Sequence, residues 1–192
     1  MKILQYPHPA LRHPARPVTA INERVRTQAR QMLELMYEAK GLGLASNQVG
    51  LPYQLIVINS SADPAKTEDE QILINPVIIE RRGSQEGEEG CLSFPDVFAK
   101  VRRAKIVKTK AYNLKGEAME ITCSDLKARL VQHEVDHLNG ILYIDKMGPI
   151  ARLAVRSEIK ALERKYRRAQ EKGEILPDAA LEKALQALEA EA

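Results

Sequence analysis

The sequence of 192 residues has little cysteine, little net charge and no long apolar run. Its two cysteines, Cys91 and Cys123, exclude a disulfide-rich scaffold. No stretch approaches the ~20 apolar residues of a membrane-spanning helix, and the first residues lack the apolar run of a signal peptide. The formal net charge of +3 does not require a nucleic-acid partner for the whole chain. We therefore expect a cytoplasmic protein that binds neither DNA nor membrane, in a compartment where cysteines stay reduced.

Apolar spacing and turn residues divide the chain into a few helices and strands. Helical periodicity and capping residues predict helices over 23–40, 125–139 and 152–172. Apolar and β-branched runs predict strands over 54–59, 72–79 (broken by Pro76), 105–112 and 117–123. Few helices and few strands, without strict alternation, favour an α+β fold over a doubly wound sheet.

The end of the chain changes sharply in charge. Residues 152–172 contain eight basic and three acidic side chains, whereas residues 173–192 contain five acidic side chains and only Lys183. The first of these segments is expected to be a basic helix, packed on the domain through its apolar side. The second is expected to be an acidic, alanine-rich tail that forms a short helix or is disordered.

The pentapeptide His133-Glu134-Val135-Asp136-His137 lies within the second predicted helix. Residues four positions apart share a helix face, so both imidazoles can bind one metal ion. Glu134 follows the first of them, where its carboxylate can take a proton from water at the metal. The pattern also occurs by chance on charged helices, and it leaves a third ligand to another segment.

Cys91 is the better candidate for that third ligand. Glu158, a downstream carboxylate, lies in the charged third helix without supporting sequence, and no histidine follows His137. Cys91 follows a glycine beside a predicted turn, although a buried cysteine often packs as a small hydrophobe, which is our interpretation of Cys123. A Cys-His-His set leaves one metal position open, which is typical of catalytic sites, and its thiolate accepts Fe²⁺ as well as Zn²⁺.

A small-residue loop over 41–48 supplies a further candidate group. Its glycines would let a ligand approach the backbone, and the Gln48 amide could donate a hydrogen bond to an oxyanion. A plain helix end and loop explains the same residues. The segment is not a phosphate loop, because the Lys-Ser/Thr ending is missing.

Taken together, three segments resemble the signature motifs of the peptide deformylase family. They are Gly41-Leu42-Gly43-Leu44-Ala45-Ser46-Asn47-Gln48, Glu89-Gly90-Cys91-Leu92-Ser93 and Gln132-His133-Glu134-Val135-Asp136-His137-Leu138-Asn139-Gly140. Their order and spacing fit the family, with Ser46 standing where alanine is usual. The likeness covers about residues 2–148.

The resemblance implies an α+β fold of mostly antiparallel sheets around a central helix that carries HExxH, plus a C-terminal helix. Together with the charge pattern, it divides the chain into a catalytic domain (1–148), a basic C-terminal helix (149–172) and an acidic Ala-rich tail (173–192) that is helical or disordered. The implied activity is the removal of the N-formyl group from the initiator methionine of nascent proteins, with release of formate.

The resemblance also implies a role for each matching residue. Cys91, His133 and His137 would bind one divalent ion per chain, with Fe²⁺ favoured and Zn²⁺, or Ni²⁺ and Co²⁺ on substitution, as alternatives. Glu134 would act as general base, while the Gln48 side chain and the Leu92 N–H would stabilise the oxyanion. The implied substrate-binding residues are Leu42, Gly43, Leu44, Gly90, Arg129 and Leu130.

Two other functions remain open at this point. A zinc endopeptidase would act on unformylated peptides and would keep its metal without Cys91. A non-catalytic ribosome- or RNA-binding module would depend on the basic helix, whose Arg164, Lys165, Arg167 and Arg168 are candidates for transient contact with ribosomal RNA phosphates.

Overall fold

The structure is a computed structural model that describes residues 1–190, so the last two residues of the predicted tail lie outside it. The helices are α1 (Glu23–Glu38), α2 (Asp125–Leu138), α3 (Pro149–Ala154), α4 (Arg156–Glu171) and α5 (Asp178–Ala190), with 3₁₀ helices η1 (Pro9–Arg12), η2 (Ser46–Val49), η3 (Thr67–Asp69) and η4 (Tyr143–Asp145). The strands are β1 (Gly43–Ala45), β2 (Leu55–Asn59), β3 (Glu70–Arg82), β4 (Gln85–Cys91), β5 (Phe94–Arg103), β6 (Ile106–Tyr112) and β7 (Ala118–Ser124). The α+β prediction is confirmed.

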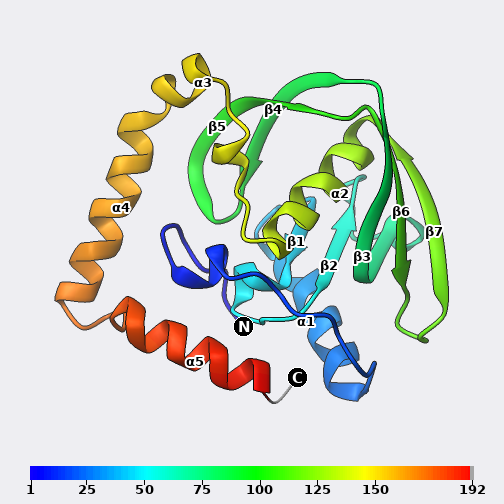
Figure 1. Cartoon of the computed structure of the whole chain (residues 1–192), viewed down its shortest axis with the longest axis horizontal. Coiled ribbons are helices and arrows are strands. Elements are labelled where there is room, and N and C mark those ends of the chain that lie inside the picture. The colour runs from blue at the N-terminus through cyan, green and yellow to red at the C-terminus, as the bar shows by residue number, and fades with distance from the viewer. Residues whose placement is uncertain (191–192) are drawn as a thin grey trace.

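The strands form two antiparallel sheets around α2 (Figure 1). One sheet has the order β1-β2-β3-β6-β7, and the other is the β4–β5 ribbon. Alternate side chains of β2 point to opposite faces of the sheet. Ile56 and Ile58 pack in a cluster with Val131 of α2, whereas Leu55 and Val57 pack beneath α1. The helix with the HExxH motif is thus held against one face of the larger sheet, and α1 covers the other face.

Two strand predictions need correction. The predicted break at Pro76 is wrong, because β3 continues through it as an irregularity, with a register shift between Ile74 and Val77. The ribbon β4–β5 was missed altogether. The β4 sequence reads Gln-Glu-Gly-Glu-Glu-Gly-Cys and has no apolar alternation, so its extended form depends on pairing with β5, whose burial does alternate.

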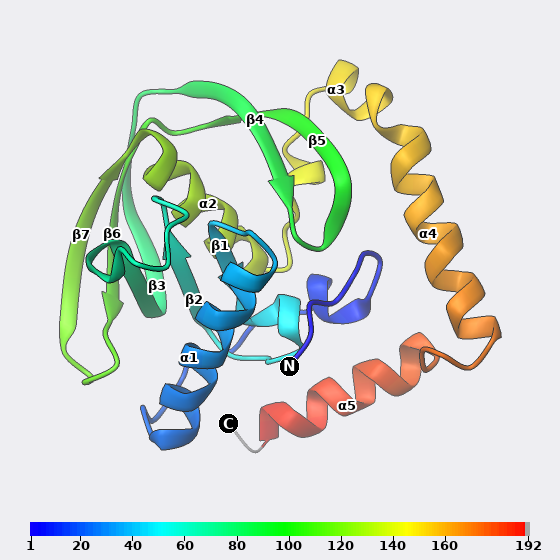
Figure 2. The same ribbon diagram turned by 180° about the vertical axis from the view of Figure 1, so that it is seen from behind.

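A C-terminal arm, defined here as residues 149–190, extends from the body and returns to it (Figures 1 and 2). The predicted helix over 152–172 is divided at Val155 into α3 and α4. After the turn at Gly173, α5 runs back to contact η1 near the N-terminal segment. No helix within residues 1–190 is long and apolar enough to cross a membrane.

Candidate metal centre and active site

Two secondary-structure elements bring the three predicted ligands together. Cys91 is the last residue of β4, and His133 and His137 lie one turn apart on α2. One ligand atom from each residue lies within 4.8 Å of the others, and Cys91 Sγ is 3.3 Å from His137 Nε2. Both imidazoles are buried. The fold therefore brings Cys91 to two histidines that lie 42 and 46 positions further along the sequence.

These residues fit a divalent metal ion. One thiolate and two imidazoles suit Fe²⁺ or Zn²⁺ and leave a position open. Burial lowers the pKa of His137 well below its ordinary value, which favours the neutral imidazole that binds metal. Among the described residues, the buried Glu134 Oε2 has no hydrogen-bond partner, as expected for an atom that faces a bound group.

Glu134 lies in a tight, buried position beside β1. Burial raises the pKa of its carboxyl group to about 7. A Cβ atom at Gly43 would lie only 2.5 Å from Glu134 Oε1. A larger residue at position 43 would therefore collide with the Glu134 carboxylate. This close approach is a structural reason for a glycine in the small-residue loop opposite the HExxH helix.

Gln48 reaches the same centre from η2. Its Nε2 group donates to Cys91 Sγ (3.4 Å) and to Ser93 Oγ (3.2 Å), while its Oε1 atom accepts from the Ala45 N–H (2.8 Å). The unusual Ser46 does not disturb this loop, since its hydroxyl donates to the carbonyl of Tyr53. The amide N–H of Gln48 therefore points toward the candidate metal ligands.

A buried ionic network beneath the ligands was missed by the sequence analysis. Glu89 Oε2 lies 3.0 Å from His133 Nδ1, and the same carboxylate accepts hydrogen bonds from Arg103 and Arg129. Arg103 also pairs with Asp136. Burial alone would raise the pKa of Glu89, but hydrogen bonds from His133 and Arg103 outweigh it and lower the pKa to about 2. The sequence signal for Glu89 was its place as the first residue of the Cys91 motif.

A cleft of about 620 Å³ opens beside this centre. Most predicted substrate-binding residues line it: Leu42, Gly43, Gly90, Arg129 and Leu130, together with Gln48 and Leu92. Leu44 is the exception, because it is fully buried in the cluster beneath α1, on the opposite side of β1 from Gly43. Phe98 and Leu126, which the sequence analysis did not consider, also line the cleft.

The ligand set, the buried carboxylate and the cleft define the class as an α+β metallohydrolase. The family model described as "Polypeptide deformylase" matches residues 1–153. A peptide deformylase of Acidobacterium capsulatum is 47% identical over 163 residues, covering 84% of this chain and 95% of its own. One of Rhodopirellula baltica is 36% identical over 181 residues, covering 94% and 90%.

Solved structures agree with these relatives. A peptide deformylase from Plasmodium falciparum has a TM-score of 0.84 at 39% identity, covering 86% of this chain and 97% of its own. One from Arabidopsis thaliana, in complex with an inhibitor, has a TM-score of 0.85 at 38% identity, covering 91% and 95%. The chain belongs to the polypeptide deformylase family, and is a metal-dependent hydrolase that removes the N-formyl group from nascent peptides. This finding excludes the zinc endopeptidase and the non-catalytic module.

Proposed function

We propose that Cys91, His133 and His137 hold the metal for this deformylation, and that Glu134, Gln48 and Leu92 carry out the chemistry on formylmethionyl peptides in the cytoplasm. The observation that carries the proposal is the convergence of the three ligand atoms, a buried carboxylate and an amide donor on one cleft. A divalent ion bound there would supply a Lewis acid that activates water and polarises the formyl carbonyl.

Glu134 is the general base in this proposal. Its carboxylate takes a proton from the attacking water and later gives it to the amine of methionine as formate leaves. A pKa near 7 in the metal-free chain suits a group that both accepts and releases a proton. The narrow space beside Gly43 keeps the carboxylate aimed into the cleft.

Gln48 and the backbone N–H of Leu92 stabilise the negative charge that develops on the formyl oxygen. The Gln48 amide is held in place at both ends, because Oε1 accepts from Ala45 while Nε2 faces Cys91. A donor that is already oriented costs little reorganisation during the reaction, and one such donor is commonly worth ~3 kcal/mol.

The substrate peptide binds between two free strand edges. Gly43 belongs to β1, the edge of the five-stranded sheet, and Gly90 belongs to β4 of the ribbon. Backbone groups on such edges accept an extended peptide as an added strand. Leu42 and Leu130 form an apolar part of the cleft lining that would receive the methionine side chain, and Arg129 lines the same cleft.

Fe²⁺ is the proposed working ion, as the likeness to the peptide deformylase family implies, and thiolate and imidazole ligands accept it as well as Zn²⁺. Ni²⁺ or Co²⁺ would serve on substitution. A ferrous thiolate site is open to oxidation at both metal and sulfur. Metal analysis of protein purified without oxygen would identify the ion, and iron-specific loss of activity in air is the expected result.

The test is amine release from formyl-Met-Ala-Ser by anaerobically purified Fe²⁺ protein, compared with Glu134→Ala. We expect a 10²–10⁴-fold loss of kcat in the variant with metal still bound. Cys91→Ala is expected to lose the metal. No release of amine by fully metallated wild type, or full metal occupancy in Cys91→Ala, would contradict the proposed site.

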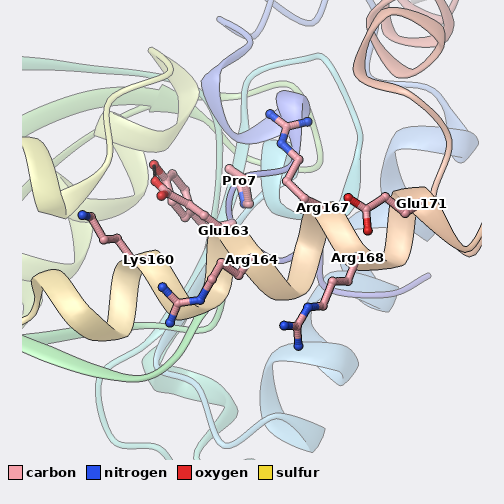
Figure 3. A pocket seen from close by; sticks show the side chains of 8 residues that line it. Pro7, Lys160, Glu163, Arg164, Arg167, Arg168 and Glu171 are labelled. Atoms are coloured by element: carbon pink, nitrogen blue, oxygen red, sulfur yellow. Dashed lines mark hydrogen bonds between the residues drawn. The ribbon is translucent and has the colours of Figure 1, made fainter.

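The C-terminal arm is proposed to give a second, weaker contact. We propose residues 1–148 as the catalytic domain. We also propose that α4 contacts ribosomal RNA near the site where nascent chains leave the ribosome. Arg164 and Arg168 lie four positions apart and project from the same side of α4 (Figure 3), whereas Arg167 is bound to Asp178. Side chains that project in this way suit a phosphate backbone.

This contact is tested by sedimentation with ribosomes. Binding at 50 mM salt should fall steeply by 200 mM, and the double change Arg164→Glu, Arg168→Glu should weaken it. The double change Lys110→Glu, Lys115→Glu, at exposed positions of β6 and the turn that follows it, alters the net charge by the same amount and is the control. Binding that does not depend on salt would count against the proposed contact.

A further inference from the structure

Arg129 lines the cleft, and its guanidinium also forms several hydrogen bonds with the β4–β5 ribbon. Its Nη1 group donates to Glu89 Oε1 (2.6 Å), to the carbonyl of Val101 (2.9 Å) and, more weakly, to that of Gly87 (3.4 Å). Its Nη2 group lies 3.4 Å from the carbonyl of Gln85. One buried guanidinium on α2 therefore joins both strands of the β4–β5 ribbon.

Gly87 makes room for this guanidinium. A Cβ atom at position 87 would lie 2.9 Å from Arg129 Nη2 and 3.1 Å from its Cζ. The backbone at Gly87 is not left-handed, so the glycine is needed for space and not for its conformation. Gly87 and Arg129 thus act as a matched pair across the gap between β4 and α2.

The partners of Arg129 belong to both halves of the proposed active site. Glu89 fixes Nδ1 of His133, and a partner of this kind orients a metal-binding imidazole and strengthens metal binding. The same strand carries Gly90 and Cys91 into the cleft. Arg103 also binds Glu89, but its other ion pair is with Asp136 on α2 and not with the ribbon backbone.

We propose that Arg129 is a positioning residue that couples the substrate-facing strand β4 to the metal ligand His133. The coupling rests on the proposed function, since it needs His133 at the metal and a peptide on β4. Arg129 holds β4, the strand that receives the peptide, and it also holds Glu89, which orients the His133 imidazole. Without Arg129, Glu89 keeps only Arg103 and His133, and the β4 backbone loses the bonds that its Gln85 and Gly87 carbonyls accept from α2.

The test compares Arg129→Met, Arg129→Lys and Gly87→Ala with wild type. Co²⁺ affinity, measured by competition with a chelator, is expected to fall 10–100-fold in Arg129→Met, as for other partners of metal ligands. The KM for formyl-Met-Ala-Ser is expected to rise more than kcat falls in the metal-loaded enzyme. Gly87→Ala should change both quantities in the same direction, although it removes no polar group.

Arg129→Lys separates the two parts of the coupling. A lysine keeps a cation near Glu89 but cannot bind several carbonyls at once, so Co²⁺ affinity should recover while KM stays raised. Glu86→Ala, on the exposed face of β4, is the matched control and should behave as wild type. Its position outside the cleft lining makes it independent of peptide binding.

A purely structural Arg129 gives a different result. Lower thermal stability with unchanged Co²⁺ affinity and unchanged KM, in both Arg129→Met and Gly87→Ala, would overturn the proposal. Equal effects in Glu86→Ala would do the same. Co²⁺ affinity is measured without substrate. A wild type that failed to deformylate would therefore refute the proposed function, whereas the Co²⁺ measurements would still test the role of Arg129.

Discussion

Two glutamates, one in the catalytic body and one in the C-terminal arm, each meet a histidine and an arginine. Glu89 contacts His133 and Arg103, all with side chains no more than 8% exposed. Glu189 contacts His13 (2.8 Å) and Arg16 (3.2 Å), but the Arg16 side chain is 69% exposed. The Glu89 cluster is thus buried throughout, whereas the Glu189 cluster, with Glu189 itself 12% exposed, has one partner that lies largely in solvent.

The difference decides what holds each region together. Buried charges depend on each other, since removing one leaves its partners without compensation in a medium that solvates them poorly. Exposed pairs contribute little, because water and salt screen them. In the arm, by contrast, Leu185 of α5 is buried, and Leu181 and Leu188 on either side of it are half-buried. We infer that charge holds the metal ligands and that apolar contact holds the arm.

The largest effect is expected from Glu89→Gln. The change leaves Arg129 and Arg103 without their shared carboxylate, and breaking a buried pair typically costs about 3–5 kcal/mol. Urea unfolding of the metal-free protein measures this loss, with Glu86→Gln on the exposed face of β4 as the control. A loss below about 1 kcal/mol would mean that the buried Glu89 pairs contribute no more to stability than exposed ion pairs do.

The ionised Glu134 carboxylate, unlike that of Glu89, should lower the stability of the metal-free protein. Its pKa is raised from 4.5 to about 7 in the folded chain, so the folded state holds the proton more tightly than the unfolded state. The contribution of Glu134 to the free energy of unfolding of metal-free protein should therefore fall by about 3 kcal/mol as the pH rises from about 4.5 to 7.

The Glu134→Gln variant isolates this dependence. It lacks the titrating group, so it should be more stable than wild type at pH 8 and closely similar near pH 4.5. Urea unfolding in the presence of a chelator at both pH values gives the difference. An offset that stays constant with pH would show that the carboxylate does not titrate in this way.

A smaller effect is expected from Leu185→Ala in α5. Leu185 is 5% exposed, and truncating a buried leucine costs about 2–5 kcal/mol, with a surface helix at the low end. The loss should appear as faster amide hydrogen exchange in α5 and η1, with kcat unchanged. Gln186→Ala, at an exposed neighbouring position, is the control. Slow exchange in Leu185→Ala would mean that other contacts hold the arm.

The smallest effect is expected from Glu189→Gln. A pair with an arginine as exposed as Arg16 contributes about 0–1 kcal/mol. Thermal unfolding at low and high salt should therefore differ from wild type by only a few degrees. If this change cost as much as Leu185→Ala, the contrast between the two regions would not hold.

Local features of the sequence were enough to predict much of the site. Four-residue spacing places His133 and His137 on one helix face, because a helix repeats every 3.6 residues. The Cys91 turn and the small-residue loop were recognisable from their composition. Leu44 was misplaced, because the direction of its side chain depends on which face of β1 meets α1.

Tertiary structure alone decided the rest. Glu89 and Arg129 are 40 positions apart, and nothing in either local sequence states that they meet. The β4–β5 ribbon has too few apolar residues on β4 to be predicted, and its strand form comes from pairing and from the Arg129 bonds. The sequence by itself was enough to predict the candidate ligands and the proposed general base, because helix and turn geometry are local. The partners that orient them were decided by the fold, because burial and charge compensation arise only when distant segments pack together.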